Sequence, residues 1–186
     1  NARESGISPA MIDRLALDMP RINALAGAVR EVGALKDPVG VILGGDTRPN
    51  GLKIIKQAVP LGVIGLIYES RPNVTVDTAV LCLKSGNACI LRGGSEAVNS
   101  NKVLADILRT ALEESGLPKD SVQLIENTDR EYANALMTLS GYVDALIPRG
   151  GKGLIQAVVK NSTVPVIETG AGMCHIYVDE FADIFK

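Results

Sequence analysis

The sequence is poor in aromatic residues and histidine. Its 186 residues include no tryptophan, four tyrosines, two phenylalanines and a single histidine, His175. The formal net charge of −2 provides no basic field for a phosphate backbone, and few rings are available to stack on bases. We therefore expect no nucleic-acid partner. A Ser-His-Asp triad would have to use His175, and no other feature of the sequence supports one.

The sequence also contains no long apolar stretch, and its first residues do not have the pattern of a secretory leader. No run approaches the roughly 20 apolar residues that span a bilayer. Residues 1–4 lack both the basic and the apolar region of a signal peptide. The cysteines, Cys82, Cys89 and Cys174, do not have the C-x-x-C spacing of zinc or redox sites. We expect a cytoplasmic protein with free thiols, no membrane association and no metal site.

From Pro60 onward, apolar β-branched runs alternate with helical patterns, and a last apolar run covers residues 174–178. Such alternation is typical of a parallel sheet with helices on both faces, so we predict an α/β fold. The runs predict strands at 61–68, 88–92, 121–126, 143–147, 164–168 and 174–178. The patterns between them predict helices at 74–85, 96–115, 129–140 and 152–160.

The first 59 residues have a different pattern. Helical spacing of apolar residues from Met11 to Leu17, and again from Pro20 to about Leu35, predicts helices within residues 1–38. Two β-rich runs, 39–43 and 52–59, flank an Asn-Gly pair that favours a turn with positive φ. We predict a β-hairpin over 39–59, followed by an α/β domain over 60–186.

Ligands of an open α/β sheet bind beyond the carboxyl ends of its strands. Four polar or glycine-rich segments have that position here, at 69–73, 92–95, 148–153 and 168–172. In the third, glycines join a strand to a helix, which suits a pyrophosphate because backbone N–H groups and the helix dipole can approach it. This segment is neither G-x-G-x-x-G nor a Walker A loop, and a tight turn with solvated charges explains it equally well.

Arg92 and Asn73 each allow two interpretations. Arg92 ends a predicted strand before two glycines, where its guanidinium could bind a phosphate, and a salt bridge to a helix carboxylate is the alternative. Asn73 could donate its amide to a developing oxyanion, but an asparagine before a helical run is more often a helix cap.

Two C-terminal segments allow similar pairs of interpretations. Glu168 follows an apolar run beside glycines, so it could be a general base, a ribose contact or a surface carboxylate. For Cys174 and His175, a core thiol and a structural histidine are favoured over a nucleophile and its base. Neighbours in a strand point to opposite faces and cannot form a hydrogen bond between their side chains.

Five stretches of the sequence resemble the gamma-glutamyl phosphate reductases, a family of the aldehyde dehydrogenase superfamily. They are Met11–Leu17, Val59–Asp77, Leu83–Gly94, Leu146–Leu154 and Cys174–Asp179. The resemblance spans essentially the whole chain. It implies reduction of L-glutamyl 5-phosphate with NADPH to L-glutamate 5-semialdehyde and phosphate, the second step of proline biosynthesis. It also implies a Rossmann-like cofactor domain, with the hairpin at 39–59 as an oligomerisation arm.

The resemblance also implies roles for individual residues. Arg92 would contact the 2′-phosphate of NADPH, with Ser95 replacing an acid of NAD-preferring relatives. Asn73 lies near the oxyanion-donor asparagine of the superfamily, with a shorter spacing to Gly86, and Arg71 would meet the substrate carboxylate unless it forms an ordinary ion pair. Glu168 would line the nicotinamide side and is the second candidate catalytic residue. The implied cofactor-binding set is Glu69, Ser70, Arg92, Gly93, Ser95, Pro148, Gly150, Gly151, Thr169 and Gly170.

The mechanism implied by the resemblance needs a residue that the sequence does not contain. A cysteine thiolate attacks the acyl phosphate, phosphate leaves, and hydride passes from NADPH to the thioester. In the family this cysteine lies in a Ser/Thr-x-Cys-Asn motif downstream of a Tyr-Val-Asp segment, and no such motif follows Val178 here. We therefore expect an inactive fragment that lacks the catalytic domain.

The resemblance implies a small-molecule substrate, a homo-oligomer and functional coupling to glutamate 5-kinase. Two other functions stay open. The chain could be a non-catalytic nucleotide-binding module, or part of an aldehyde dehydrogenase for another substrate.

Overall fold

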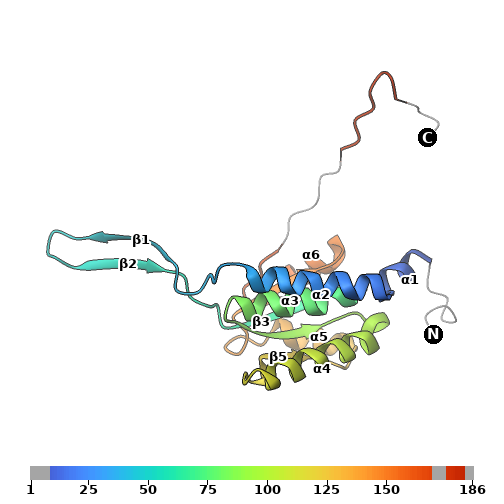
Figure 1. Ribbon diagram of the computed structural model, residues 1–186, viewed down its shortest axis with the longest axis horizontal. Helices are drawn as coiled ribbons and strands as arrows, with labels where there is room; N and C mark the ends of the chain where they lie inside the picture. Colours follow the sequence, from blue (N-terminus) through green and yellow to red (C-terminus); the bar gives the residue numbers. More distant parts are fainter. Residues whose placement is uncertain (1–8, 169–174, 183–186) are drawn as a thin grey trace.

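The computed structural model describes residues 9–168 and 175–182, and two helices begin this part of the chain (Figure 1). They are α1 (Pro9–Leu15) and α2 (Met19–Ala34). Asp18 caps α2, because its Oδ1 accepts the N–H of Arg21 at 2.9 Å. Pro20 fits the first turn of α2, where its missing N–H would have had no partner within the helix. Helix α2 packs along α3 (Pro72–Lys84), outside the layers of the central sheet.

The predicted hairpin is present and projects from the body of the molecule (Figure 1). Strands β1 (Ile42–Thr47) and β2 (Lys53–Gln57) pair antiparallel. In the turn between them Gly51 has φ +86°, a value that favours glycine, and Asn50 Oδ1 accepts the N–H of Leu52 at 3.1 Å. Every residue of both strands is exposed.

The central sheet has four parallel strands in the order β5-β4-β3-β6. Its strands are β3 (Val63–Tyr68), β4 (Ala88–Arg92), β5 (Val122–Leu124) and β6 (Ala145–Arg149). The remaining helices are α4 (Val98–Glu114), α5 (Arg130–Met137) and α6 (Lys152–Asn161), with short 3₁₀ turns at Ser95–Ala97 and Lys119–Ser121. Helices cover both faces of the sheet, as the alternating sequence pattern predicts.

Each face of the sheet has its own hydrophobic core. Leu66 belongs to the core that also contains residues of α3 and α4, whereas its neighbour Ile67 belongs to the core with residues of α5 and α6. Both side chains are only 2% exposed. Adjacent residues of a strand point to opposite faces, so a strand buried on both sides must be apolar at every position. This explains the continuous apolar run of β3.

The strand order places a topological switch point between β3 and β6. From β3 the chain crosses to β4 on one side, and later returns to β6 on the other side. The loops after β3 and β6 therefore run in opposite directions and leave a crevice at the carboxyl edge, where ligands of doubly wound sheets bind.

Two predicted strands are wrong. In 164–168 only an isolated bridge forms, between Leu146 and Val166, because Pro165 has no N–H to donate. In 174–178, Cys174 lies outside the described residues, and 175–178 form no strand. Ile176 and Tyr177 are 91% and 87% exposed, since no strand edge in the described part of the chain pairs with them.

Candidate functional site

The loops after β3 and β6 meet at the switch point. The N–H of Glu69 donates to the carbonyl of Arg149 at 3.2 Å. In the opposite direction, the N–H of Gly151, which caps α6, donates to Glu69 Oε2 at 2.9 Å. A carboxylate therefore already occupies the positive end of the α6 dipole. The glycine turn binds an anion, and in this structure the anion belongs to the protein.

Gly150 leaves room for this contact. A Cβ at this position would lie 2.7 Å from the carboxyl carbon of Glu69 and 2.8 Å from Cδ2 of Leu154. A side chain at this position would therefore displace the ends of the Glu69 and Leu154 side chains. The charged group at this turn is the Glu69 carboxylate, to which the Gly151 N–H donates.

A hollow of about 250 Å³ opens at the switch point. Its lining carries more positive than negative charge, because three arginines line it and Glu69 is its single acidic residue. The lining residues are Arg14, Glu69, Ser70, Arg71, Val74, Arg149, Gly150 and Gly151.

Ser70 adopts an unusual backbone conformation that Glu96 stabilises. Its φ of +22° is rare for a residue with a side chain. The N–H of Ser70 donates to Glu96 Oε1 at 3.0 Å, and its hydroxyl donates to the same oxygen. Burial would raise the pKa of the Glu96 carboxyl, but these donors, the Ser95 hydroxyl and the backbone N–H of Glu96 together hold that pKa below its usual value.

Arg92 lies at the end of β4 and is half-buried. Its Nη1 donates to the carbonyl of Gly93 at 3.1 Å and its Nη2 donates to the carbonyl of Thr128. Its Nε is buried without a hydrogen-bond partner, and within the described ranges no carboxylate pairs with this guanidinium. The observed contacts are therefore not the predicted alternative, a salt bridge to a helix carboxylate.

The Arg92 side chain lines a cavity of about 650 Å³. This cavity extends from the carboxyl ends of β3 and β4 to helices α5 and α6. Its polar lining includes Ser95, Glu96, Thr128, Arg130 and Asn134. It is large enough for part of a dinucleotide.

A buried hydrogen-bond chain supports the backbone after β4. Thr75 Oγ1 donates to Asn101 Oδ1 at 3.0 Å, so the Tyr68 hydroxyl, 2.7 Å from the same Oγ1, acts as the donor to Thr75. Burial raises the pKa of Tyr68 to about 12. Gly93 lies on this network, because a Cβ there would be 2.1 Å from Nδ2 of Asn101 and 3.1 Å from the Tyr68 ring.

Comparison with known proteins assigns this arrangement to a family. The sequence profile of the aldehyde dehydrogenase family matches residues 22–186, which is most of the chain. The chain belongs to the aldehyde dehydrogenase family.

Within this family, the chain is similar to gamma-glutamyl phosphate reductases. It is 62% identical over 183 residues to that of Clostridium botulinum (strain Alaska E43 / Type E3), and 58% identical over 184 residues to that of Lachnospira eligens. These alignments cover 98% and 99% of this chain, and 44% of each relative.

Solved structures of gamma-glutamyl phosphate reductases are also similar to this chain. The gamma-glutamyl phosphate reductase of Thermotoga maritima superimposes with a TM-score of 0.90 at 52% identity, over 99% of this chain and 44% of that chain. That of Saccharomyces cerevisiae gives 0.78 at 34% identity, over 99% and 47%. The chain therefore spans a little under half the length of the proteins that it matches.

The structure bears on the predictions made for two site residues of this aldehyde dehydrogenase chain, Asn73 and Arg71. The helix-cap interpretation of Asn73 is wrong: α3 begins at Pro72 with Arg71 as its N-cap, and Asn73 Nδ2 donates to Asp77 Oδ2 at 2.9 Å. The side chain of Arg71 is exposed, and no ion pair forms with it anywhere in residues 9–168 or 175–182.

Four other predicted site residues do not lie in the glycine turn or the switch-point hollow, or lie outside the described residues. Pro148 lies buried inside β6, opposite Ile67, rather than in the turn. Glu168 is exposed beyond the Val166 bridge. Thr169 and Gly170 lie outside the described residues.

Sequence reasoning overlooked several functional candidates. Glu96 supports Ser70, Thr128 holds Arg92, and Arg14 lines the switch-point hollow. The position of Glu96 directly after a predicted site segment was a usable signal. Thr128 acts through its backbone carbonyl, so its residue type carries no signal.

None of the described helices is long and apolar enough to cross a membrane. The described residues also contain no group of three or more His, Cys, Asp or Glu side chains that could hold a metal ion.

Proposed function

We propose that the chain is the cofactor-binding part of an NADPH-dependent enzyme that reduces L-glutamyl 5-phosphate to L-glutamate 5-semialdehyde and phosphate. The observation that carries this proposal is the 62% identity to a gamma-glutamyl phosphate reductase over 98% of the chain. The proposal assigns the nucleophilic cysteine to a catalytic domain outside these 186 residues.

The residues after β4 fit a phosphorylated ribose. The Arg92 guanidinium lines the 650 Å³ cavity and has N–H groups to spare, including a buried Nε without a partner. Its planar fork suits the 2′-phosphate that distinguishes NADPH from NADH. Ser95 adds a hydroxyl without charge, and the Glu96 carboxylate is occupied by donors from Ser70 and Ser95. NADPH, when bound, would supply the hydride.

The turn after β6 fits a pyrophosphate through its backbone N–H groups, rather than through a charged side chain such as that of Arg92. The Gly151 N–H already binds an anionic oxygen of Glu69 at 2.9 Å. A cofactor phosphate at the start of α6 would take over this donor, and the Glu69 side chain would turn away. Gly150 keeps the backbone accessible for that exchange.

Roles for three further residues follow from the proposal. Arg71 has an exposed guanidinium near the switch point, which supports a contact with the anionic substrate. One N–H of the Asn73 amide donates to Asp77, so the second N–H would serve as the oxyanion donor. The catalytic role of Glu168, together with the nicotinamide contacts of Thr169 and Gly170, stays a prediction.

We also propose that the hairpin makes the enzyme a homo-oligomer. Both strands are exposed and carry apolar side chains, with Ile42 at 66% and Ile55 at 62%. An isolated two-stranded hairpin is at best marginally stable in water, so pairing with a second copy would stabilise it. A cytoplasmic location and coupling to glutamate 5-kinase stay predictions.

The proposal is tested by assaying the complete gene product that contains this sequence. We expect reduction of NADP⁺ that requires both glutamate 5-semialdehyde and inorganic phosphate. Turnover without phosphate would indicate an aldehyde dehydrogenase for a different reaction. Binding of NADP⁺ without any turnover would favour a non-catalytic nucleotide-binding module.

A further inference from the structure

The structure leads us to propose that Arg14 of α1 acts with Arg71 as a two-arginine clamp for an oxyanion group of the substrate. The proposed function supplies the identity of that substrate, whereas the clamp itself is argued from geometry and charge. It adds a specificity-determining residue from a helix outside the sheet.

Arg14 and Arg71 line the same two hollows. One is the 250 Å³ hollow at the switch point, which also contains Arg149 and the glycine turn. The other, of about 430 Å³, lies between α1, α2 and the first turns of α3 and does not reach that turn. The two arginines are the residues common to both, so they stand where the hollows join.

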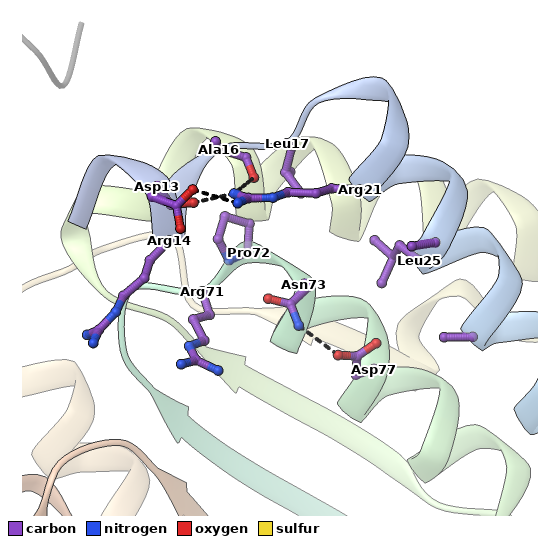
Figure 2. A pocket seen from close by; sticks show the side chains of 12 residues that line it. Asp13, Arg14, Ala16, Leu17, Arg21, Leu25, Arg71, Pro72, Asn73 and Asp77 are labelled. Atoms are coloured by element: carbon purple, nitrogen blue, oxygen red, sulfur yellow. Dashed lines mark hydrogen bonds and ion pairs between the residues drawn. The ribbon is translucent and has the colours of Figure 1, made fainter. Parts of the chain in front are cut away.

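The acidic side chains around these hollows already have partners, and Arg149 is the one further cation of the hollows, within the described residues, that has no ion pair. Asp13 forms an ion pair with Arg21 at 2.6 Å, and Asp77 accepts the Asn73 amide at 2.9 Å (Figure 2). Glu69 accepts the Gly151 N–H. Across the described part of the chain, no hydrogen bond or ion pair involves the guanidinium of Arg14 or that of Arg71.

Figure 2 shows the Arg14 and Arg71 side chains extending to the same side of the pocket, away from the Asp13–Arg21 pair. Two like charges that line the same hollow repel each other, and an anion between them would remove the repulsion. Paired guanidinium groups bind carboxylate and phosphate oxygens through several charge-assisted hydrogen bonds.

Arg21 positions Arg14. Besides its ion pair with Asp13, Arg21 Nη1 donates to the carbonyl of Ala16 at 3.2 Å and to that of Asp13. A residue of α2 thereby holds the end of α1 in place, and with it the preceding turn that carries Arg14. The exposed helix α1 thus becomes part of the site.

A ligand that fits this clamp is a small molecule with a carboxylate or phosphoryl group. Both groups occur in an acyl phosphate of an amino acid, so inorganic phosphate and L-glutamate serve as separate probes. The cofactor is the control ligand, because its proposed contacts are the backbone N–H of Gly151 and the guanidinium of Arg92. The clamp instead uses the guanidinium groups of Arg14 and Arg71.

The test is calorimetric titration of the complete gene product with inorganic phosphate, L-glutamate and NADP⁺, each alone. We expect Arg14→Gln to weaken binding of phosphate or of glutamate about tenfold, as loss of one charge-assisted contact predicts. Binding of NADP⁺ should stay within about twofold. Arg14→Lys should restore part of the lost affinity, because it restores the charge but not the fork.

Arg30→Gln is the matched control, since it removes an exposed arginine of α2 that lines neither hollow. The clamp is refuted if the wild-type protein binds neither phosphate nor glutamate, if Arg14→Gln binds both as wild type does, or if NADP⁺ binding falls equally. Absence of phosphate-dependent turnover in the wild-type protein would remove the proposed function instead. The titrations would still decide the role of Arg14.

Discussion

The end of β4 and the switch point between β3 and β6 both carry arginines, but they are built differently. Arg92 is half-buried, donates to two carbonyls, and follows a strand supported by the buried Tyr68–Thr75–Asn101 chain. At the switch point Arg71 and Arg149 are exposed and lack ion pairs within the described residues. The β4 end is therefore organised before any ligand arrives, whereas the switch point depends on ligand to balance its charge.

The largest effect is expected for Gly93→Ala, which tests whether the carboxyl end of β4 is rigid without ligand. The new Cβ would lie 2.1 Å from Nδ2 of the buried Asn101. We expect a loss of about 2–3 kcal/mol in the free energy of unfolding, as overpacking of a rigid interior predicts. Urea denaturation measures this loss. Gly33→Ala in α2 is the control, because a Cβ there would meet nothing within 4 Å, and an equal loss in both variants would refute the argument.

Arg92→Ala tests whether the end of β4 binds the 2′-phosphate of the cofactor. Removing a charge-assisted fork should cost about 2 kcal/mol of NADPH binding, or roughly thirtyfold in Kd. Binding of NADH should change little, because it has no 2′-phosphate. Fluorescence titration of the two cofactors gives the ratio. An equal loss for both would mean that Arg92 supports the fold of the site rather than the phosphate.

Glu96 follows β4, and its carboxylate accepts hydrogen bonds from Ser70, which follows β3. The pH dependence of the protein's stability tests this contact between the two loops. Because the pKa of Glu96 in the folded protein is lowered, its contribution to stability is present above the pKa of the unfolded chain and is lost as the pH falls through the folded value. We expect wild-type stability to fall between about pH 5 and pH 3 more steeply than that of Glu96→Gln. Parallel pH profiles of the denaturation midpoint would contradict this role.

The smallest effect is expected at the switch point. Arg149 is exposed without an ion pair in the described ranges, so Arg149→Gln should change the free energy of unfolding by less than about 0.5 kcal/mol. Its effect should appear instead as weaker binding of anionic ligands. A stability loss as large as that of Gly93→Ala would show that both ends are structural.

The sequence predicted the buried strands best. The range expected for β4, 88–92, is the one observed, because a strand buried on both faces is a short apolar run bounded by polar and glycine residues. Prediction failed for 164–168, where Pro165 limits pairing, and for 175–178, where no partner strand is present in the described residues. An apolar run becomes a strand only if a neighbouring edge pairs with it.

The candidate site was predictable in its parts but not in its contacts. Periodicity locates strand ends, and so it located Arg92, Gly150 and Gly151. It could not show that Glu69 would bind the N–H of Gly151, 82 residues away, or that Glu96 would hold Ser70, 26 residues away. These contacts depend on which loops meet in space.

By itself, the sequence determined the order and type of the elements from α1 to α6, because each residue's periodicity and turn chemistry act within a few neighbours. The tertiary structure decided the order β5-β4-β3-β6 and, with it, the switch point. Strand neighbours are chosen by burial of both sheet faces across long crossovers, a property of the whole chain. The same packing brought α1 and Arg14 to the site, which no local pattern could indicate.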